Sequence, residues 1–198
     1  MGVFLSEQIC RNTFFSVFLH FYESLLNMKK TPVSSLFMKD CFADAVIRLL
    51  EENRLDEIQV KQICEVSGYH RASWFRSFHS KHEAVTYKMV RLWQNWSEEH
   101  GLTVRDEFTL DNAEAFFCYN YEIRDITSLL YRRGLMDDVC ASFTAILYSK
   151  YREDRYKRYR AALFSYALFG VLQEWISHDF NEPPTVMAHF ISETFRQL

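Results

Sequence analysis

The most regular pattern in the chain begins at Phe37, where apolar and charged positions separate with the period of an α-helix. Apolar residues recur at i, i+3, i+4, i+7 and i+8, and charged residues fill the opposite side. The apolar positions are Phe42, Ala45, Val46, Leu49 and Leu50, and the charged ones are Asp44, Arg48, Glu51 and Glu52. This spacing predicts an amphipathic helix of about four turns.

A much shorter apolar face follows and ends at a glycine. Val60, Ile63 and Val66 predict a second helix of about two turns. Gly68 ends it, because glycine adopts the positive φ of a helix C-terminus at little cost. A helix this short is marginal in water, so packing against the rest of the fold must hold it.

A helix-start signal predicts the next two helices. Ser80-Lys81-His82-Glu83 has the composition of a capping box, which opens a fourth helix. The third helix must therefore be short, from about Arg71 to Phe78. The fourth runs toward Gly101 with an apolar stripe of Val85, Met89, Leu92, Trp93 and Trp96.

The second half of the chain predicts further helices after a polar connection. Asp111 can cap a helix that buries Ala115, Phe116 and Tyr119, and its apolar surface continues through Leu129, Leu130 and Tyr131 to Gly134. Another helix begins at Asp137 or Asp138. A long one is expected over about 154–178, and Pro183-Pro184 separates it from a last helix over 185–196. With five Gly, three Pro and no alternating Val- or Thr-rich run in 198 residues, we predict an all-α fold.

The first 36 residues form an extension to which two interpretations apply. The apolar run Phe14–Leu26 is too short and too polar to span a bilayer, and no small-residue cleavage site follows it. Met28, followed by Lys29 and Lys30, indicates an alternative translation start. The other interpretation is an additional amphipathic helix that docks on the body of the protein.

Charge and cysteine content narrow the class of protein. The net charge of −3 excludes a globally basic protein, but binding to DNA needs only a local positive face. An odd number of cysteines without C-x-x-C spacing is typical of reduced core thiols in a cytoplasmic protein. They are Cys10, Cys41, Cys64, Cys118 and Cys140.

Positive charge is concentrated on the two short helices. Between Gln59 and His82 there are four basic residues against one acidic residue, a local net charge of +3. Two short helices joined at a glycine turn are the arrangement of a helix-turn-helix DNA reader, whose second helix enters the major groove. Trp74 and Phe78 share one face and would anchor that helix, while Arg71 and Arg76 would reach base edges or phosphates.

The segment from Phe42 to Val85 resembles the TetR family of bacterial transcriptional regulators. The matching elements are Ile58, Val60, Ile63, Gly68, Ser73-Trp74-Phe75, Phe78, Ser80, Lys81 and Glu83. The later stretch FGVLQEWISHDFNEPPTVMAHFI resembles the last two helices of some members. The resemblance implies a helix-turn-helix domain over residues 37–100 and a helical regulatory and dimerisation domain over 101–198.

The resemblance also assigns DNA-contacting positions. It places Arg71, Ala72, Ser73 and Phe75 toward the groove, and Val60, Lys61, Ser77 and Lys81 against phosphates. The expected set is completed by Arg76 and by His70, whose imidazole can accept a backbone N–H or touch a phosphate. The sequence departs from the family at Gln59, His70 and Phe75, where a Thr, a small capping residue and a Tyr are usual.

The family's behaviour implies partners for this chain. We expect a homodimer formed through the last two helices, a near-palindromic double-stranded operator, and a small-molecule effector that releases a repressor. The ligand-pocket candidates are Phe116, Tyr119, Phe143 and Tyr166, although aromatics at helical spacing are more often plain core. The three departures leave open a second hypothesis, a co-regulator with the same fold and weak or no DNA binding.

The sequence gives little support for an enzyme, a metal site or a single-strand nucleic-acid binder. No nucleophile-elbow, Walker or dinucleotide-binding motif occurs, so we expect neither an enzyme nor a cofactor. His79 and His82 form an H-x-x-H pair without a nearby third ligand, which argues against a metal site. The tract YSKYREDRYKRYR interleaves bases and tyrosines as single-strand binders do, but its helical spacing favours a solvated face.

Overall fold

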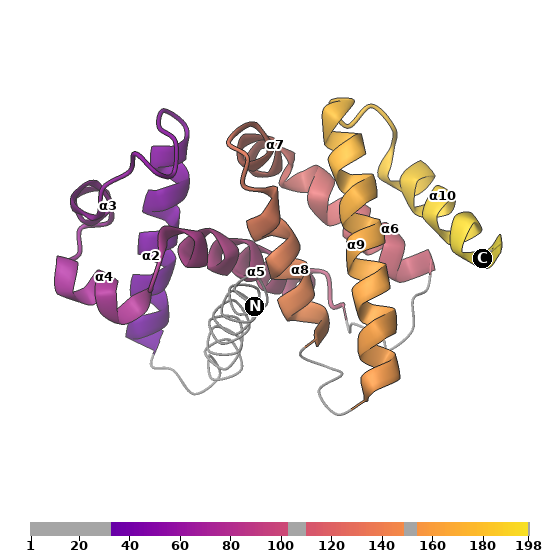
Figure 1. The fold of residues 1–198 in the computed structure, drawn as a ribbon, viewed down its shortest axis with the longest axis horizontal. Helices are drawn as coiled ribbons and strands as arrows, with labels where there is room; N and C mark the ends of the chain where they lie inside the picture. The colour runs from indigo at the N-terminus through magenta and orange to yellow at the C-terminus, as the bar shows by residue number, and fades with distance from the viewer. Residues whose placement is uncertain (1–32, 103–109, 149–153, 198) are drawn as a thin grey trace, which may run out of the picture.

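The computed structural model describes residues 33–102, 110–148 and 154–197, and every regular element in these ranges is an α-helix (Figure 1). The prediction of an all-α fold is confirmed. The helices are α2 (Val33–Leu50), α3 (Val60–Ser67), α4 (Arg71–Ser77), α5 (Lys81–Glu99), α6 (Leu110–Glu122), α7 (Arg124–Arg132), α8 (Met136–Tyr148), α9 (Arg155–Ser177) and α10 (Pro184–Gln197). The predictions for Phe14–Leu26 and Met28 lie outside the described residues.

The N-terminal lobe consists of α2, α3, α4 and the first half of α5. The apolar stripe predicted for α2 forms its centre, since Phe42, Val46 and Leu50 are fully buried. In α3, however, the prediction for Val66 was wrong, because this side chain is 42% exposed. Steps of three residues turn a helix by only 300°, so an i, i+3, i+6 series drifts off the buried face. Cys64, rather than Val66, packs against the core beside Ile63.

Helix α5 connects the two lobes. Its start packs on α2, and it also packs against α8 of the C-terminal lobe, as its central position in Figure 1 shows. In that lobe α6 packs on α10, and α8 packs on α9. The apolar surface predicted over 111–134 belongs to two helices that break at Ile123, and Tyr131 at its end is exposed.

The corner between α9 and α10 is fixed by an aromatic anchor. Asp179 and Phe180 have positive φ values of 54° and 55°, which are uncommon for residues with a side chain. The Phe180 ring is buried against Trp175, with centroids 4.8 Å apart. The indole N–H of Trp175 donates to the carbonyl of Glu182 at 3.1 Å, so one side chain holds both sides of the corner. Within the described ranges, no helix has the length and apolarity needed to cross a membrane.

Candidate nucleic-acid interface

The turn between α3 and α4 has the geometry that its glycine predicts. Gly68 has φ 76°, and its N–H donates to the carbonyl of Cys64 at 3.0 Å, which closes the end of α3. No atom lies within 4 Å of the place where a Cβ would stand at Gly68, so the φ angle and not space selects glycine there. Two helices of eight and seven residues thus meet at a tight left-handed turn.

Helix α4 is held to the lobe by a chain of aromatic contacts. Trp74 and Phe78 are buried, and their ring centroids lie 5.3 Å apart. Trp74 meets the ring of Phe42 on α2 at 5.4 Å, and Phe78 meets Tyr87 on α5 at 5.4 Å. Seven residues make too short a helix to be stable alone, so these contacts provide its stability.

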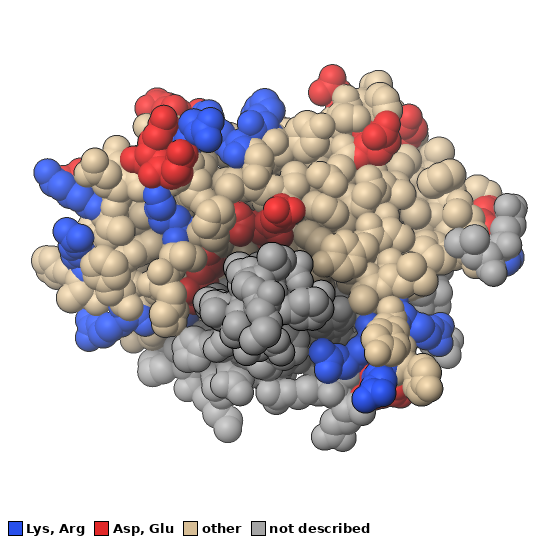
Figure 2. All heavy atoms as spheres, viewed as in Figure 1, with Lys and Arg blue, Asp and Glu red and all other residues tan. Residues whose placement is uncertain are grey.

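The opposite face of α4 is turned to solvent. Arg71, Ala72, Phe75 and Arg76 are exposed, and Phe75 keeps 56% of its surface in contact with water. The Arg71 guanidinium lies over the Phe75 ring at 5.4 Å. Figure 2 shows Lys and Arg side chains around this end of the molecule. An aromatic ring that is exposed beside a cation, on a helix whose other aromatic rings are buried, offers a contact surface to a polyanion.

Two serines of α4 serve the helix itself. The Ser77 hydroxyl is buried and donates to the carbonyl of Ser73 at 2.8 Å. The hydroxyl of Ser73 accepts from the Arg76 guanidinium at 3.2 Å, which draws Arg76 along the helix. Ser77 therefore lies inside, although the resemblance assigned it to a phosphate, and Ser73 is only partly exposed.

The helix starts in this region are capped in ways that the sequence only partly predicts. Ser80 accepts from the N–H of Glu83 at 3.0 Å, as its capping box requires. The Glu83 carboxylate reaches back one residue further than expected, to the N–H of His79 at 2.7 Å. At α3 the side chain of Gln62 accepts from the N–H of Gln59 at 2.7 Å. His70 precedes α4 with an exposed imidazole that makes no capping hydrogen bond.

The remaining α3 candidates lie at its start. Val60 is half-buried, and its side chain packs on the core. Lys61 is exposed, and its ammonium lies 3.7 Å from the Glu65 carboxylate one turn later. Exposed pairs of this kind contribute little to stability. Lys61 thus remains available to exchange this partner for a phosphate.

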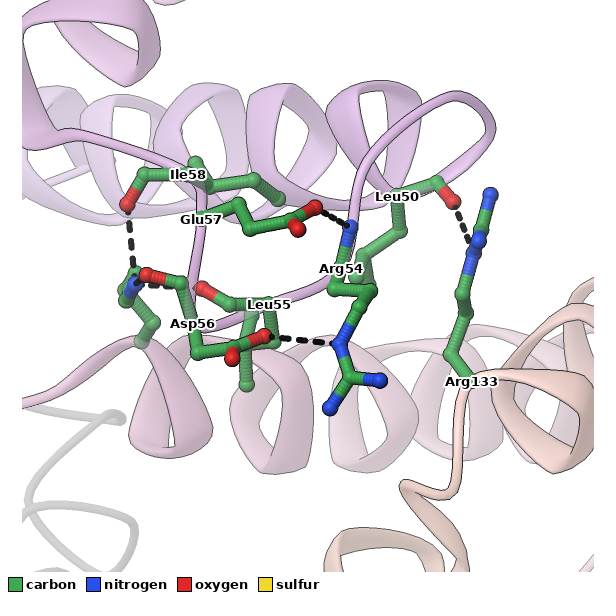
Figure 3. Close-up of polar contacts among 8 residues, drawn as sticks. Leu50, Arg54, Leu55, Asp56, Glu57, Ile58 and Arg133 are labelled. Atoms are coloured by element: carbon green, nitrogen blue, oxygen red, sulfur yellow. Dashed lines mark hydrogen bonds and ion pairs between the residues drawn. The ribbon is translucent and has the colours of Figure 1, made fainter.

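Lys81 points into the fold instead of toward solvent. Its ammonium donates to the carbonyl of Leu55, to that of Asp56 at 3.1 Å and to that of Ile58 at 2.8 Å. Figure 3 shows these carbonyls converging from the turn between α2 and α3. An ammonium has three hydrogens, so these bonds use all of them. In this structure Lys81 fixes the turn that leads into α3, a role that its sequence position did not indicate.

Two polar contacts join the N-terminal lobe to the corner between α7 and α8. Arg133 donates to the carbonyls of Leu50 and Glu51 at 2.7 Å each, which caps the end of α2 (Figure 3). Five residues later, Asp138 lies 2.8 Å from the imidazole Nδ1 of His82, the second residue of α5. Burial raises the pKa of the Asp138 carboxyl, and the neighbouring imidazole opposes that shift.

The C-terminal half provides the decisive comparison with known proteins. The sequence profile of a TetR C-terminal family, described as "Transcriptional regulator C-terminal region", matches residues 112–197. This region follows the helix-turn-helix lobe described above. The C-terminal half of the chain therefore matches the TetR family of transcriptional regulators.

The other comparisons with known proteins give distant matches or none. A solved structure with a similar course is that of the TetR family repressor AlkX from Dietzia sp. strain DQ12-45-1b, implicated in biodegradation of n-alkanes. It is 15% identical, with a TM-score of 0.41 over 78% of this chain and 90% of that one. Among curated proteins, none is detectably similar in sequence.

The four candidate ligand-pocket residues do not all lie together. Phe116 and Phe143 are buried with ring centroids 5.1 Å apart, between α6 and α8. Tyr119 is also buried, and its hydroxyl donates to the carbonyl of Met89 on α5 at 3.2 Å. Tyr166 is exposed on the outer face of α9, so the structure removes it from any interior site. Periodicity alone did not separate the two faces of α9, because both carry large apolar residues.

The interior of the C-terminal lobe contains one polar group that the sequence analysis missed. Asn120 is fully buried, and its amide N–H donates to the carbonyl of Phe116 at 2.8 Å. Its Oδ1 accepts no hydrogen bond from any part of the chain that the structure describes. A buried acceptor without a partner costs about 1–3 kcal/mol. An asparagine between two tyrosines, Tyr119 and Tyr121, in α6 was the available signal.

Among the described residues we found neither a metal site nor an activated thiol. No group of three His, Cys, Asp or Glu side chains is arranged there to hold a metal ion. His79 and His82 turn to different carboxylates, Glu83 and Asp138. Burial raises the pKa values of the thiols of Cys64, Cys118 and Cys140, which keeps them protonated and unreactive.

Proposed function

We propose that the chain is a sequence-specific DNA-binding repressor that acts as a homodimer and is released by a small-molecule effector. The observation that carries the proposal is the two-faced construction of α4. Trp74 and Phe78 fasten one face to the lobe, while Arg71, Phe75 and Arg76 stand on the other. A short helix presented in this way fits the major groove of B-DNA, where Arg reads guanine edges.

The expected homodimer is supported by the outer faces of the last two helices. Leu163 and Tyr166 on α9 and Val186 and Phe190 on α10 are large apolar residues exposed to solvent. Stacked rings of Phe164 and Phe195, 4.6 Å apart, join α9 to α10, and Figure 1 shows both helices in the part of the molecule away from α4. An apolar face shared by two helices is typical of a subunit interface.

Asn120 supports a small-molecule effector site in the interior of the C-terminal lobe. An apolar, aromatic interior in which the Asn120 Oδ1 has no partner among the described residues would suit a small neutral molecule that can donate a hydrogen bond. Binding would act by a population shift between dimers whose α4 helices fit the operator and dimers whose helices do not.

One observation favours the second candidate, a co-regulator with weak or no DNA binding. The ammonium of Lys81, which the family resemblance assigns to a phosphate, is engaged by three backbone carbonyls. A lost phosphate contact lowers affinity for every sequence alike.

A gel shift with the DNA upstream of the gene separates the two candidates. The native protein should retard this duplex in excess competitor DNA, with affinity that falls as salt rises. Arg71→Ala should weaken binding by about 1–3 kcal/mol, because it removes one base or phosphate contact without touching the core. The matched control is Arg132→Ala, an exposed arginine on α7. Retardation that is equal for native protein and Arg71→Ala, or absent for both, would overturn the proposal.

A further inference from the structure

Helix α9 carries a continuous exposed apolar stripe along its outer face. Tyr156, Tyr159, Leu163 and Tyr166 are all more than half exposed and follow the i, i+3, i+7, i+10 spacing of one helix face. The next position on this face is Gly170, which is also exposed. The stripe therefore covers more than three turns, and no other described segment packs over it.

Gly170 is an unusual residue for the middle of a helix. Glycine there costs about 1 kcal/mol relative to alanine. Its φ is not positive, and a Cβ added to it would meet no atom within 4 Å, so neither the backbone nor this protomer's packing requires glycine. A glycine in an exposed apolar stripe lets the backbone of another helix approach closely, since no side chain stands between them.

The residues at the start of α9 and those at its end and in the corner after it carry charges of opposite sign. Residues 154–160 contain four Lys or Arg and one Asp, a net charge of +3. Residues 174–182 contain Glu174, Asp179 and Glu182 and no Lys or Arg, a net charge of −3. Figure 2 shows the two colours at opposite ends of the helix, blue near its start and red near its end.

A second copy of α9 complements such a helix in one direction only. In a two-fold interface, residue i of one copy meets residue j of the other, and j meets i. A parallel pair would place the two basic ends together and the two acidic ends together, whereas an antiparallel pair places each basic end on an acidic end. If Leu163 lies over Gly170 of the other copy, the same register brings Tyr159 opposite Glu174 and Arg155 opposite His178.

We propose that two copies of this chain pack α9 antiparallel on α9, crossing closely at Leu163 and Gly170, with the basic start of each helix against the acidic end of the other. The proposal rests on the proposed homodimer and adds its direction, its register and its electrostatic lock. Double-stranded DNA is not the partner of this basic segment, because α9 lies at the end of the molecule opposite the DNA-reading helix α4 (Figure 1).

Charge reversal tests the direction. One variant carries Arg155→Glu and Arg160→Glu, a second carries Glu174→Arg and Glu182→Arg, and a third carries all four changes. Dimer dissociation constants come from sedimentation velocity without DNA, and far-UV circular dichroism checks that each variant is folded. The first two should each dimerise at least about tenfold more weakly in low salt, because helix ends of like charge then face each other in place of ends of opposite charge. The third should recover native affinity within about threefold. An equimolar mixture of the first two should form a heterodimer.

Gly170→Leu tests the crossing separately. Leucine favours the helix more than glycine, so the variant should stay folded by far-UV circular dichroism while the dimer dissociates at least about tenfold more readily. The proposal is overturned if the native chain is a monomer at 100 μM, if the first two charge variants dimerise like the native chain, or if the fourfold variant does not recover. All of these readouts are made without DNA, so a failure of the DNA-binding proposal leaves them unchanged.

Discussion

The guanidinium of Arg133, on the C-terminal lobe, donates from Nε to the carbonyl oxygen of Leu50, at the end of α2, at 2.7 Å. The last carbonyls of a helix have no partner within it, and a charged donor satisfies them well. The contact therefore makes the C-terminal lobe part of the structure of the N-terminal lobe. Any movement of the corner between α7 and α8 acts directly on α2, against which α3 packs.

Replacing Arg133 should loosen this connection. Arg133→Ala should lower the free energy of unfolding by about 1–2 kcal/mol, because two carbonyls lose a charged donor at a partly exposed site. Arg132→Ala, one residue earlier and exposed, should change stability by less than about 0.5 kcal/mol. Urea unfolding followed by tryptophan fluorescence measures both. Equal effects of the two substitutions would show that the cap contributes nothing.

The two faces of α4 should respond oppositely to truncation. Trp74→Ala should cost about 3–5 kcal/mol of stability, since it empties the contact between α4 and Phe42. Phe75→Ala should change stability by less than about 0.5 kcal/mol, yet weaken DNA binding several-fold. Thermal unfolding and DNA titration of each variant measure the two effects. A large loss of stability in Phe75→Ala, with DNA binding unchanged, would refute the division of faces.

Lys81 and Lys61 can be distinguished by salt dependence. Lys81→Ala should lower stability by about 1–3 kcal/mol, because three carbonyls of one turn lose their donor. Its DNA affinity should keep the native dependence on salt. Lys61→Ala should leave stability unchanged and lower the slope of log affinity against log salt by about one unit. The opposite assignment, with the slope change in Lys81→Ala, would make Lys81 the phosphate contact that the family resemblance implies.

Alkaline pH should destabilise the fold through its buried tyrosines. Burial raises the pKa of Tyr119, and burial together with the Asp40 carboxylate raises that of Tyr87. An unfolded tyrosine releases its proton near pH 10, whereas the folded state retains it, so stability is lost as pH rises above about 10. The loss should approach about 1.4 kcal/mol per pH unit for each of the two groups. Tyr119→Phe should flatten this dependence, and Tyr156→Phe at an exposed site should not. Identical curves for the two variants would exclude Tyr119 as a cause.

Local features of the fold were predictable from the sequence, and long-range polar contacts were not. Gly68 and Ser80 fixed the ends of α3 and α5 because a positive φ and an N-cap depend only on neighbouring residues. The contact between Arg133 and Leu50 joins residues 83 positions apart, which no spacing rule connects. The family resemblance assigned Lys81 to a phosphate, but its flexible stem lets the ammonium turn inward to the carbonyls of Leu55, Asp56 and Ile58.

The candidate site divides in the same way. The aromatic anchor of α4 followed from helical periodicity, since Trp74 and Phe78 are four residues apart. Tyr166 was misplaced because α9 has two apolar faces, one toward the core and one toward solvent, and periodicity does not say which is which. Asn120 was overlooked because only the packed interior shows that its carbonyl oxygen has no described partner.

Selection from a random pool of duplexes tests the central claim, that a dimer of this chain reads a specific DNA sequence through two copies of α4. Native protein should enrich a near-palindrome whose half-sites lie about 10 bp, or roughly 34 Å, apart or a multiple of that distance. The Arg71→Ala variant should relax the preference at one position in each half-site. A pool that remains random after repeated rounds with folded, dimeric native protein would contradict the claim.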